Sequence, residues 1–284
     1  MAIKIDTILS SLNDFPTLPT IYSKLMTSIS NPRSTVNDVA EIIIKDQATT
    51  VKLLKLVNSP IFGIRNRVNN VTQAIFLLGF NEVKNLVLSL SILELFKNAD
   101  DKGSKYTIAL WKHTIAVATF TKILGNNLGV KDTENYFVSG IVHDIGVLFF
   151  LYKFSDLYSS LIDKSIEQNL SLDVLEKETF GMSRNVIGGL IAEKWKLPIN
   201  LKNVIQYANI GIIDGKADEL ISCVHLADII AKIMDLHYIP NPVVPIPNFQ
   251  IWNKLTFDNN ILKNQYQLFL DSYQASSNII KLAK

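Results

Sequence analysis

The chain has 284 residues, of which 48% are hydrophobic, and this is the composition of a globular protein and not of a disordered chain. Lys and Arg number 28 and Asp and Glu number 26, a net charge of +2, which is too balanced for a dedicated nucleic-acid binder. The single cysteine, Cys223, excludes a disulfide within the chain and any zinc site built from several cysteines.

Three features of the sequence bear on location. A lone thiol fits a reducing compartment. Asp6 and Asp14 interrupt the N-terminal stretch at positions where a signal peptide would be apolar. The most apolar run, residues 86–96, contains serines and a glutamate and is shorter than the ~18 residues that cross a bilayer. We therefore expect a cytoplasmic protein that does not cross a membrane.

The apolar spacing is helical along nearly the whole chain, and the scarcity of Gly (12) and Pro (9) also favours helices. Helices are predicted at residues 36–44, from Asp46 to near Asn58, 72–78, from Asn81 through Phe96, 106–128, from after Asp132 through Leu148, 156–168, 172–178, 184–194, 201–209, 218–236 and 258–282. Thr35, Asp46 and Asn81 are the expected N-caps of the helices that follow them. The sequence therefore predicts an all-α fold.

Three segments interrupt this helical pattern. Residues 62–70, with a glycine and several asparagines, read as a loop. Residues 98–105 are polar and charged, which is typical of an exposed turn or linker. Residues 237–248 hold four of the nine prolines, so no helix can run through them and an extended connector is expected.

The candidate chemistry lies in two histidines and two aspartates on apolar helices. His113 lies in ALWKHTIAVA, His143 and Asp144 in SGIVHDIGVLFF, and Asp228 in CVHLADIIA. A buried carboxylate is costly unless a cation or hydrogen-bond donors satisfy it. Two imidazoles and two carboxylates from three helices would hold one divalent ion, and this mixed N/O set suits Mn, Fe, Ni or Zn. One ion with open positions is the arrangement of metal-assisted hydrolysis.

Simpler interpretations of these residues remain open. Each His or Asp could be satisfied by backbone groups, a nearby hydroxyl or a lysine. His225 precedes Asp228 by three residues and competes with it as a partner on the same helix face. His237, which borders the proline-rich connector, is expected to be exposed. Gly140 and Gly146, about one turn either side of His143, would allow a neighbouring helix or a ligand to approach closely.

The order H…HD…D resembles the HD superfamily of metal-dependent phosphohydrolases, and the match extends to its HDOD branch, the HD-related output domains of bacterial signalling proteins. The resemblance runs from about Leu12 to Asp235. The matching motifs are LPT, IIIKDQ, LLKLVNSPIFG, AIFLLG, WKHTIAVA, FVSGIVHDIG, WKLP and VHLAD, which occur in the family's order. This resemblance implies an all-helical domain in a bacterial, cytoplasmic signalling protein.

The resemblance also implies a division of the chain. Residues 1–100 would be an N-terminal helical subdomain, residues 101–236 an HD-like helical core, and residues 237–284 a proline-rich connector with a C-terminal helix. It assigns His113, His143, Asp144 and Asp228 to a single-metal HD site.

The sequence departs from the multi-metal HD branch at two places. Arg184 follows FGMS at a position that often carries a histidine, and Gln206-Tyr207-Ala208 stand where paired histidines are expected. An arginine would repel a second cation, so a two-metal phosphodiesterase is not expected. Arg184 could instead pair with Asp144 or Asp228 or meet an anionic ligand, or it could be an exposed arginine at a helix N-terminus.

The leading expectation is a stand-alone regulatory module that binds a signalling protein or a small nucleotide-like ligand, without catalysis. Neither a membrane nor nucleic acid is expected as a partner. The alternative is a single-metal phosphohydrolase that acts on a nucleotide or phosphoester. If a cofactor is present, it is one divalent transition metal (Mn, Fe, Ni or Zn).

Overall fold

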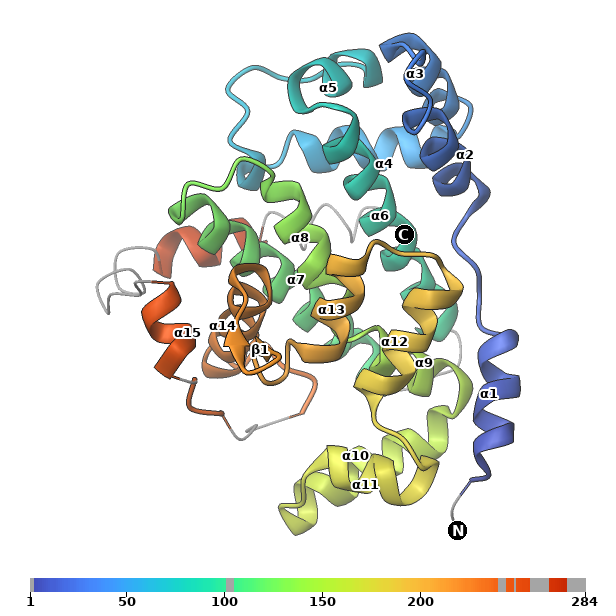
Figure 1. Ribbon diagram of the computed structural model, residues 1–284, viewed down its shortest axis with the longest axis vertical. Helices are drawn as coiled ribbons and strands as arrows, with labels where there is room; N and C mark the ends of the chain where they lie inside the picture. Colours follow the sequence, from blue (N-terminus) through green and yellow to red (C-terminus); the bar gives the residue numbers. More distant parts are fainter. Residues whose placement is uncertain (1–2, 101–104, 240–243, 248, 256–265, 275–284) are drawn as a thin grey trace.

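The computed structural model describes residues 3–100, 105–239, 244–247, 249–255 and 266–274, and these form an all-α fold with one short β-hairpin (Figure 1). The predicted fold class is confirmed. The helices are α1 (Ile5–Asn13), α2 (Thr20–Ile29), α3 (Val36–Ile44), α4 (Gln47–Val57), the 3-10 turn η1 (Pro60–Phe62), α5 (Val71–Leu78), α6 (Phe80–Asp100), α7 (Lys105–Asn127), α8 (Thr133–Val142), α9 (Ile145–Lys153), α10 (Ser155–Gln168), α11 (Leu172–Phe180), α12 (Arg184–Lys194), α13 (Ile199–Tyr207), α14 (Glu219–Ile233) and α15 (Phe249–Lys254).

Helices α2 to α5 form a bundle at one end of the molecule (Figure 1). Local signals set their ends. Thr35 caps α3 in a reciprocal capping box with Asp38, and the Asp46 side chain accepts a hydrogen bond from the Thr49 N–H at the start of α4. The prediction for residues 36–44 is therefore confirmed at both ends.

The helix after Gly79 begins earlier than predicted. Gly79 has a positive φ of 94°, which turns the backbone so that α6 starts at Phe80 and Asn81 is not its cap. At its other end α6 continues to Asp100 and α7 begins at Lys105. The predicted linker at 98–105 is thus helical at 98–100, and its residues 101–104 lie outside the described part of the chain.

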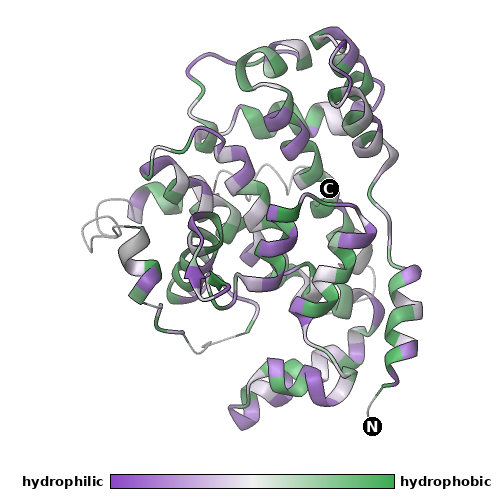
Figure 2. Ribbon diagram, in the orientation of Figure 1, coloured by the Kyte–Doolittle hydropathy of each residue, from purple (hydrophilic) through white to green (hydrophobic). Residues whose placement is uncertain are grey.

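A second group of helices forms the core around α7. Helix α7 packs against α8 and α14, and α9 packs against α12. The central helices are mostly hydrophobic (Figure 2). Gly140 of α8 lies so close to α7 that a Cβ there would come within 2.3 Å of the Ala118 Cα. The close approach expected at Gly140 is therefore made by a neighbouring helix.

The predicted continuous helix from after Asp132 through Leu148 is two helices. Asp132 caps α8 as expected, but the helix ends at Val142, and His143 and Asp144 form the turn to α9. Residues 133–153 together are apolar and long enough to cross a membrane, yet 83% of their apolar 18-residue window is buried inside the protein. Its apolar surface is thus covered by the neighbouring helices.

The last part of the chain contains two elements that the sequence analysis did not predict. Strands β1 (Ile212–Ile213) and β2 (Lys216–Ala217) form a hairpin, and the positive φ angles of Asp214 and Gly215 at its turn fit a type I′ turn. Helix α15 is also additional. The described residues 237–239 and 244–247 are not helical, as predicted. Most of the helix predicted at 258–282 lies outside the described residues, although 266–274 are helical.

Helix α1 lies apart from the α2–α5 bundle and packs along the core (Figure 1). The Lys194 ammonium of α12 donates hydrogen bonds to the carbonyls of Leu12, Asn13 and Phe15 at 2.7–2.9 Å. The Phe15 ring stacks on Trp195 with centroids 5.9 Å apart. A lysine from another helix therefore caps the C-terminal end of α1.

Candidate functional site

The four predicted site residues come together where three helices meet. His113 lies in the middle of α7, His143 and Asp144 form the α8–α9 turn, and Asp228 lies in α14. The His113 Nε2 atom is 3.3 Å from Asp228 Oδ1 and 3.7 Å from Asp144 Oδ2. The His143 Nε2 atom is 3.5 Å from Asp144 Oδ2. Residues more than one hundred positions apart in the sequence thus share one site.

Close backbone packing fixes the α8–α9 turn. A Cβ at Gly146 would come within 2.0 Å of the Arg184 carbonyl oxygen, so the first turn of α9 lies directly against the start of α12. The close approach expected at Gly146 is therefore again made by a helix. On the other side of the turn, the His143 Nδ1 atom donates to the Gly140 carbonyl at 2.7 Å. This bond fixes the orientation of the His143 ring.

The hydrogen bonds of His113 and His143 leave one lone pair on each ring. His113 Nδ1 lies 2.8 Å from the Leu236 carbonyl, which can only accept, so this nitrogen carries the proton, as it does in His143. Among the described residues, neither Nε2 atom has a hydrogen-bond partner, although both are buried. Burial also lowers the pKa of His143. One ligand atom from each of His113, His143 and Asp144 lies within 4.8 Å of the others, so these three residues could hold an ion, and Asp228 forms a second such group with His113 and His237.

A lysine already neutralises one of these carboxylates. The Lys232 Nζ atom is 2.6 Å from Asp228 Oδ2, one helical turn further along α14. Burial alone would raise the pKa of Asp228, but the Lys232 ammonium holds it well below its usual value. Asp228 is therefore ionised and paired with a cation of the protein.

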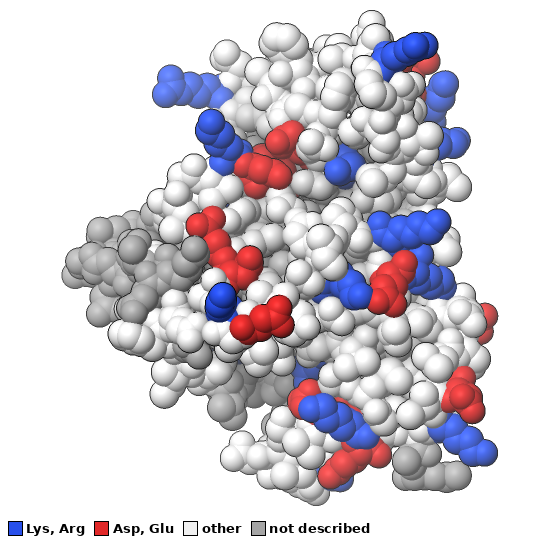
Figure 3. All heavy atoms as spheres, viewed as in Figure 1, with Lys and Arg blue, Asp and Glu red and all other residues white. Residues whose placement is uncertain are grey.

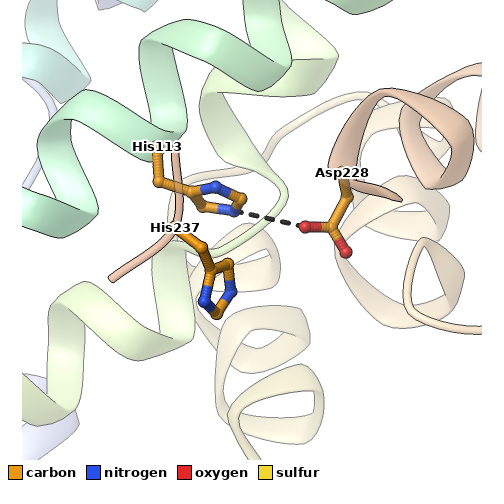
Figure 4. A group of neighbouring side chains, drawn as sticks. All are labelled: His113, Asp228 and His237. Atoms are coloured by element: carbon orange, nitrogen blue, oxygen red, sulfur yellow. Dashed lines mark ion pairs between the residues drawn. The ribbon is translucent and has the colours of Figure 1, made fainter. Parts of the chain in front are cut away.

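His237 also belongs to the site, which corrects the expectation that it is exposed. Its side chain is half-buried, and its ring lies 4.6 Å from that of His113 and 4.2 Å from that of Tyr238, between ring centroids. Figure 4 shows His237 beside His113, with Asp228 facing both. One ligand atom from each of these three residues lies within 4.8 Å of the others.

The hydrogen bonding of His237 differs from that of the other two rings. The Ile239 N–H donates to His237 Nδ1 at 3.0 Å, so this nitrogen is an acceptor and the proton of the neutral ring is on Nε2. Burial lowers the pKa of His237 well below its usual value, so the ring is neutral. His237 therefore presents an N–H donor where His113 and His143 present lone pairs.

The competing candidate, His225, faces another direction. Its Nδ1 atom lies 2.8 Å from the Ala208 carbonyl at the end of α13. This bond and the burial of His225 indicate that its side chain has a structural role in the packing between α13 and α14. His225 is not in either of the His and Asp groups that could hold an ion among the described residues.

Arg184 lines the site, but it pairs with neither Asp144 nor Asp228. Its Nε atom is 3.0 Å from a carboxylate oxygen of Glu176, and its Nη1 atom donates to the Tyr238 hydroxyl at 2.8 Å. Tyr158 donates to the same carboxylate at 2.5 Å. The side chain of Arg184 is 17% exposed, so it is not the exposed arginine that the sequence left open. This network connects α10, α11 and α12 to the segment after α14.

A pocket of about 720 Å³ opens beside these residues. One wall contains the site and the residues around it, namely His143, Asp144, Arg184, Asp228, Lys232 and His237. The lining also includes the turn between α10 and α11, with residues 165–166 and 169–173. Asn169 has a positive φ of 50°, which ends α10 and starts this turn. The pocket lining thus combines charged groups of both signs with aliphatic side chains.

Sequence reasoning missed His237, Lys232, Glu176 and Tyr238 as members of the site. Lys232 had a readable signal, because a lysine four residues after an aspartate on a helix faces that aspartate. His237, Glu176 and Tyr238 gave no such signal, because they reach the site only through contacts between segments that are far apart in the sequence. Gln206, which lies in the segment where the multi-metal branch has paired histidines, has a packing role, since its side chain lies against Gly189.

Comparisons with known proteins give one family. The family model for the HDOD domain matches residues 15–210. A curated protein of Treponema pallidum, which has no assigned function, is 25% identical over 229 residues. That match covers 79% of this chain and 43% of the relative, so the chain spans less than half of the length of that relative.

Two solved structures share the fold over nearly the whole chain. A crystal structure of an HDOD domain protein from Geobacter sulfurreducens has a TM-score of 0.77 at 22% identity and covers 97% of this chain and 99% of its own. A structure from Shewanella amazonensis, named provisionally as a phosphohydrolase, has a TM-score of 0.71 at 23% identity and covers 96% and 97%. At these identities the likeness concerns the fold alone.

Proposed function

The chain belongs to the HDOD domain family, and from this premise we propose that it is a regulatory module of signal transduction that acts by binding a small ligand or a protein partner, without turnover. The observation that carries the proposal is the Lys232–Asp228 pair, 2.6 Å long, inside the candidate site. A carboxylate that already has a protein cation does not require a metal to be stable in the folded state. The site can therefore be stable in the folded protein without a metal ion.

The size and charge of the pocket support a nucleotide-like ligand. A volume of about 720 Å³ is within the ~300–1,000 Å³ range of small-molecule sites. Lys232 and the His237 N–H offer donors to an anionic group, while asparagines and aliphatic side chains of the pocket suit a ring system. On the face of the molecule shown in Figure 3, basic and acidic side chains alternate and form no basic patch. The pattern on this face does not favour nucleic acid.

The test combines a binding assay with a turnover assay on the full chain. Thermal denaturation against a panel of nucleotides should identify a ligand that raises the melting temperature, and Ser171→Trp at the exposed rim of the pocket should remove that rise. Ser30→Trp, at an exposed position outside the pocket lining, is the matched control and should keep the rise. Phosphate release from the same panel should stay at background with Mn²⁺ or Ni²⁺ added. Chelator-sensitive release that His143→Ala abolishes would contradict the proposal.

One observation favours a second candidate, a single-metal phosphohydrolase. The buried Nε2 atoms of His113 and His143 point into the site without a partner among the described residues. With Asp144 and Asp228 these rings would hold one ion, which when bound would act as a Lewis acid on a phosphoester. His237 would donate its N–H to an anionic oxygen of the substrate. In this case purified protein should contain about one transition metal per chain, and His143→Ala should lose both the metal and the activity.

A further inference from the structure

The salt bridge between Lys232 and Asp228 lies inside the group of residues that could hold an ion. Asp228 Oδ2 contacts the ammonium at 2.6 Å, and Asp228 Oδ1 faces His113 Nε2 at 3.3 Å. The side chains are 17% and 12% exposed, so water screens their charges only weakly. One oxygen of the Asp228 carboxylate thus contacts a protein cation, and the other faces the Nε2 atom of His113.

A divalent ion bound to Asp228 would therefore have a positive charge nearby. Asp228 Oδ1 and His113 Nε2, 3.3 Å apart, would be among the atoms that hold the ion, and the ammonium contacts the other oxygen of the same carboxylate. Like charges repel strongly at this range when they are largely shielded from water. We propose that Lys232 is an internal counter-ion that competes with a divalent metal for Asp228 and so sets the metal affinity of this site.

The surroundings of Lys232 allow this competition to be reversible. Lys232 and Asp228 both line the 720 Å³ pocket, so the flexible lysine side chain can turn its ammonium into the pocket when an ion arrives. Without an ion, the ammonium returns to Asp228, and the helix positions need not change. The metal-free state is therefore an ordered state of the site. Its stability lowers the apparent affinity for the ion.

This inference rests on the metal-binding residues of the second candidate function and not on the proposed ligand binding. The test measures the dissociation constant of Mn²⁺ by calorimetry on the chelator-treated full chain. Lys232→Met removes the charge at nearly constant length. Lys232→Gln is the second variant, because it keeps a donor for Asp228 if the methionine variant folds poorly. Lys45→Met is the matched control, since Lys45 also pairs with a carboxylate four residues away, Glu41, but both side chains are exposed.

We expect Lys232→Met and Lys232→Gln to bind Mn²⁺ at least tenfold more tightly than the unmodified chain. Lys232→Arg, which keeps the charge, and Lys45→Met should remain within threefold of it. Equal or weaker binding in both neutral variants, while His143→Ala still abolishes binding, would overturn the role of Lys232 and leave the metal site intact. No Mn²⁺ binding in any variant would overturn both the inference and the metal site, and the nucleotide assay would still test the regulatory function separately.

Discussion

Three imidazoles surround the site, and their backbone partners divide them into two kinds. His113 and His143 each donate from Nδ1 to a carbonyl oxygen, which leaves a lone pair on Nε2. His237 accepts the Ile239 N–H at Nδ1, which places the proton on Nε2. A metal needs a lone pair, and an anionic oxygen needs a donor. The same side chain therefore has two different roles within one cluster.

This difference gives a prediction for metal binding. His143→Ala should weaken Mn²⁺ binding at least about a hundredfold, because it removes a ligand, whereas His237→Asn should change it by less than about threefold. The measurement is calorimetric titration of the metal-free chain. If His237→Asn weakens binding as much as His143→Ala does, the Nε2 atom of His237 is a ligand and the proton assignment is wrong.

Residue spacing predicted part of the site for a physical reason. His113, His143, Asp144 and Asp228 each interrupt an apolar stretch of the sequence, and polar groups in such positions turn toward one another or toward a shared ligand. Their proximity in the structure follows from the packing of α7, α8 and α14. His237 carries no such signal, because its contact with His113 arises only when the chain after α14 folds back over α7.

At the scale of elements, local chemistry predicted helix ends well where a cap or a glycine determines them. The capping box of Thr35 and Asp38 is an interaction within four residues, so the sequence contains it completely. The break between α8 and α9 contains no proline and no glycine at the turn itself, and the apolar pattern continues through it. It coincides with close packing of neighbouring helices at Gly140 and Gly146, where the sequence predicted a close approach but not which helices make it.

Helix α1 gives a prediction at this scale, since one side chain from α12 holds its C-terminal end. Lys194→Met removes three hydrogen bonds to the carbonyls of Leu12, Asn13 and Phe15. We expect the free energy of unfolding to fall by about 1–2 kcal/mol and hydrogen exchange to increase in α1 before other helices.

The control for this prediction is Lys24→Met, at an exposed position of α2. It should change neither the stability nor the exchange of α1 measurably. A uniform increase in exchange over all helices in Lys194→Met, with no preference for α1, would show that Lys194 acts on global stability and does not hold α1 specifically.

At the scale of the whole molecule, a buried ion pair lies where the bundle meets the core. The Lys122 ammonium of α7 is 2.8 Å from a carboxylate oxygen of Glu134 in α8 and 3.7 Å from the centroid of the Phe62 ring, which follows α4. Both charged residues are buried. Burial lowers the pKa of Lys122, and the Glu134 carboxylate opposes this shift. The pair therefore couples the α2–α5 side of the molecule to the core.

Removal of either partner leaves a buried charge without its direct partner. Lys122→Met and Glu134→Gln should each lower the free energy of unfolding by about 3 kcal/mol. The double variant should lose clearly less than the two single losses added together, with a coupling of about 2 kcal/mol, because neither charge of the pair then remains. Denaturant unfolding measures all three values, and additive losses would contradict the coupling.

The pH dependence of Glu134→Gln tests the same pair independently. Without the carboxylate, the pKa of Lys122 in the folded state falls further below the ~10.4 of an unfolded chain. Between these two values the unfolded state binds more protons than the folded state, so the free energy of unfolding rises with pH. The deficit of Glu134→Gln relative to the unmodified chain should therefore shrink between pH 7 and pH 9.5. Lys122→Met has no such titrating group, so its deficit should not shrink in this way, and a parallel recovery in both variants would assign the effect to another group.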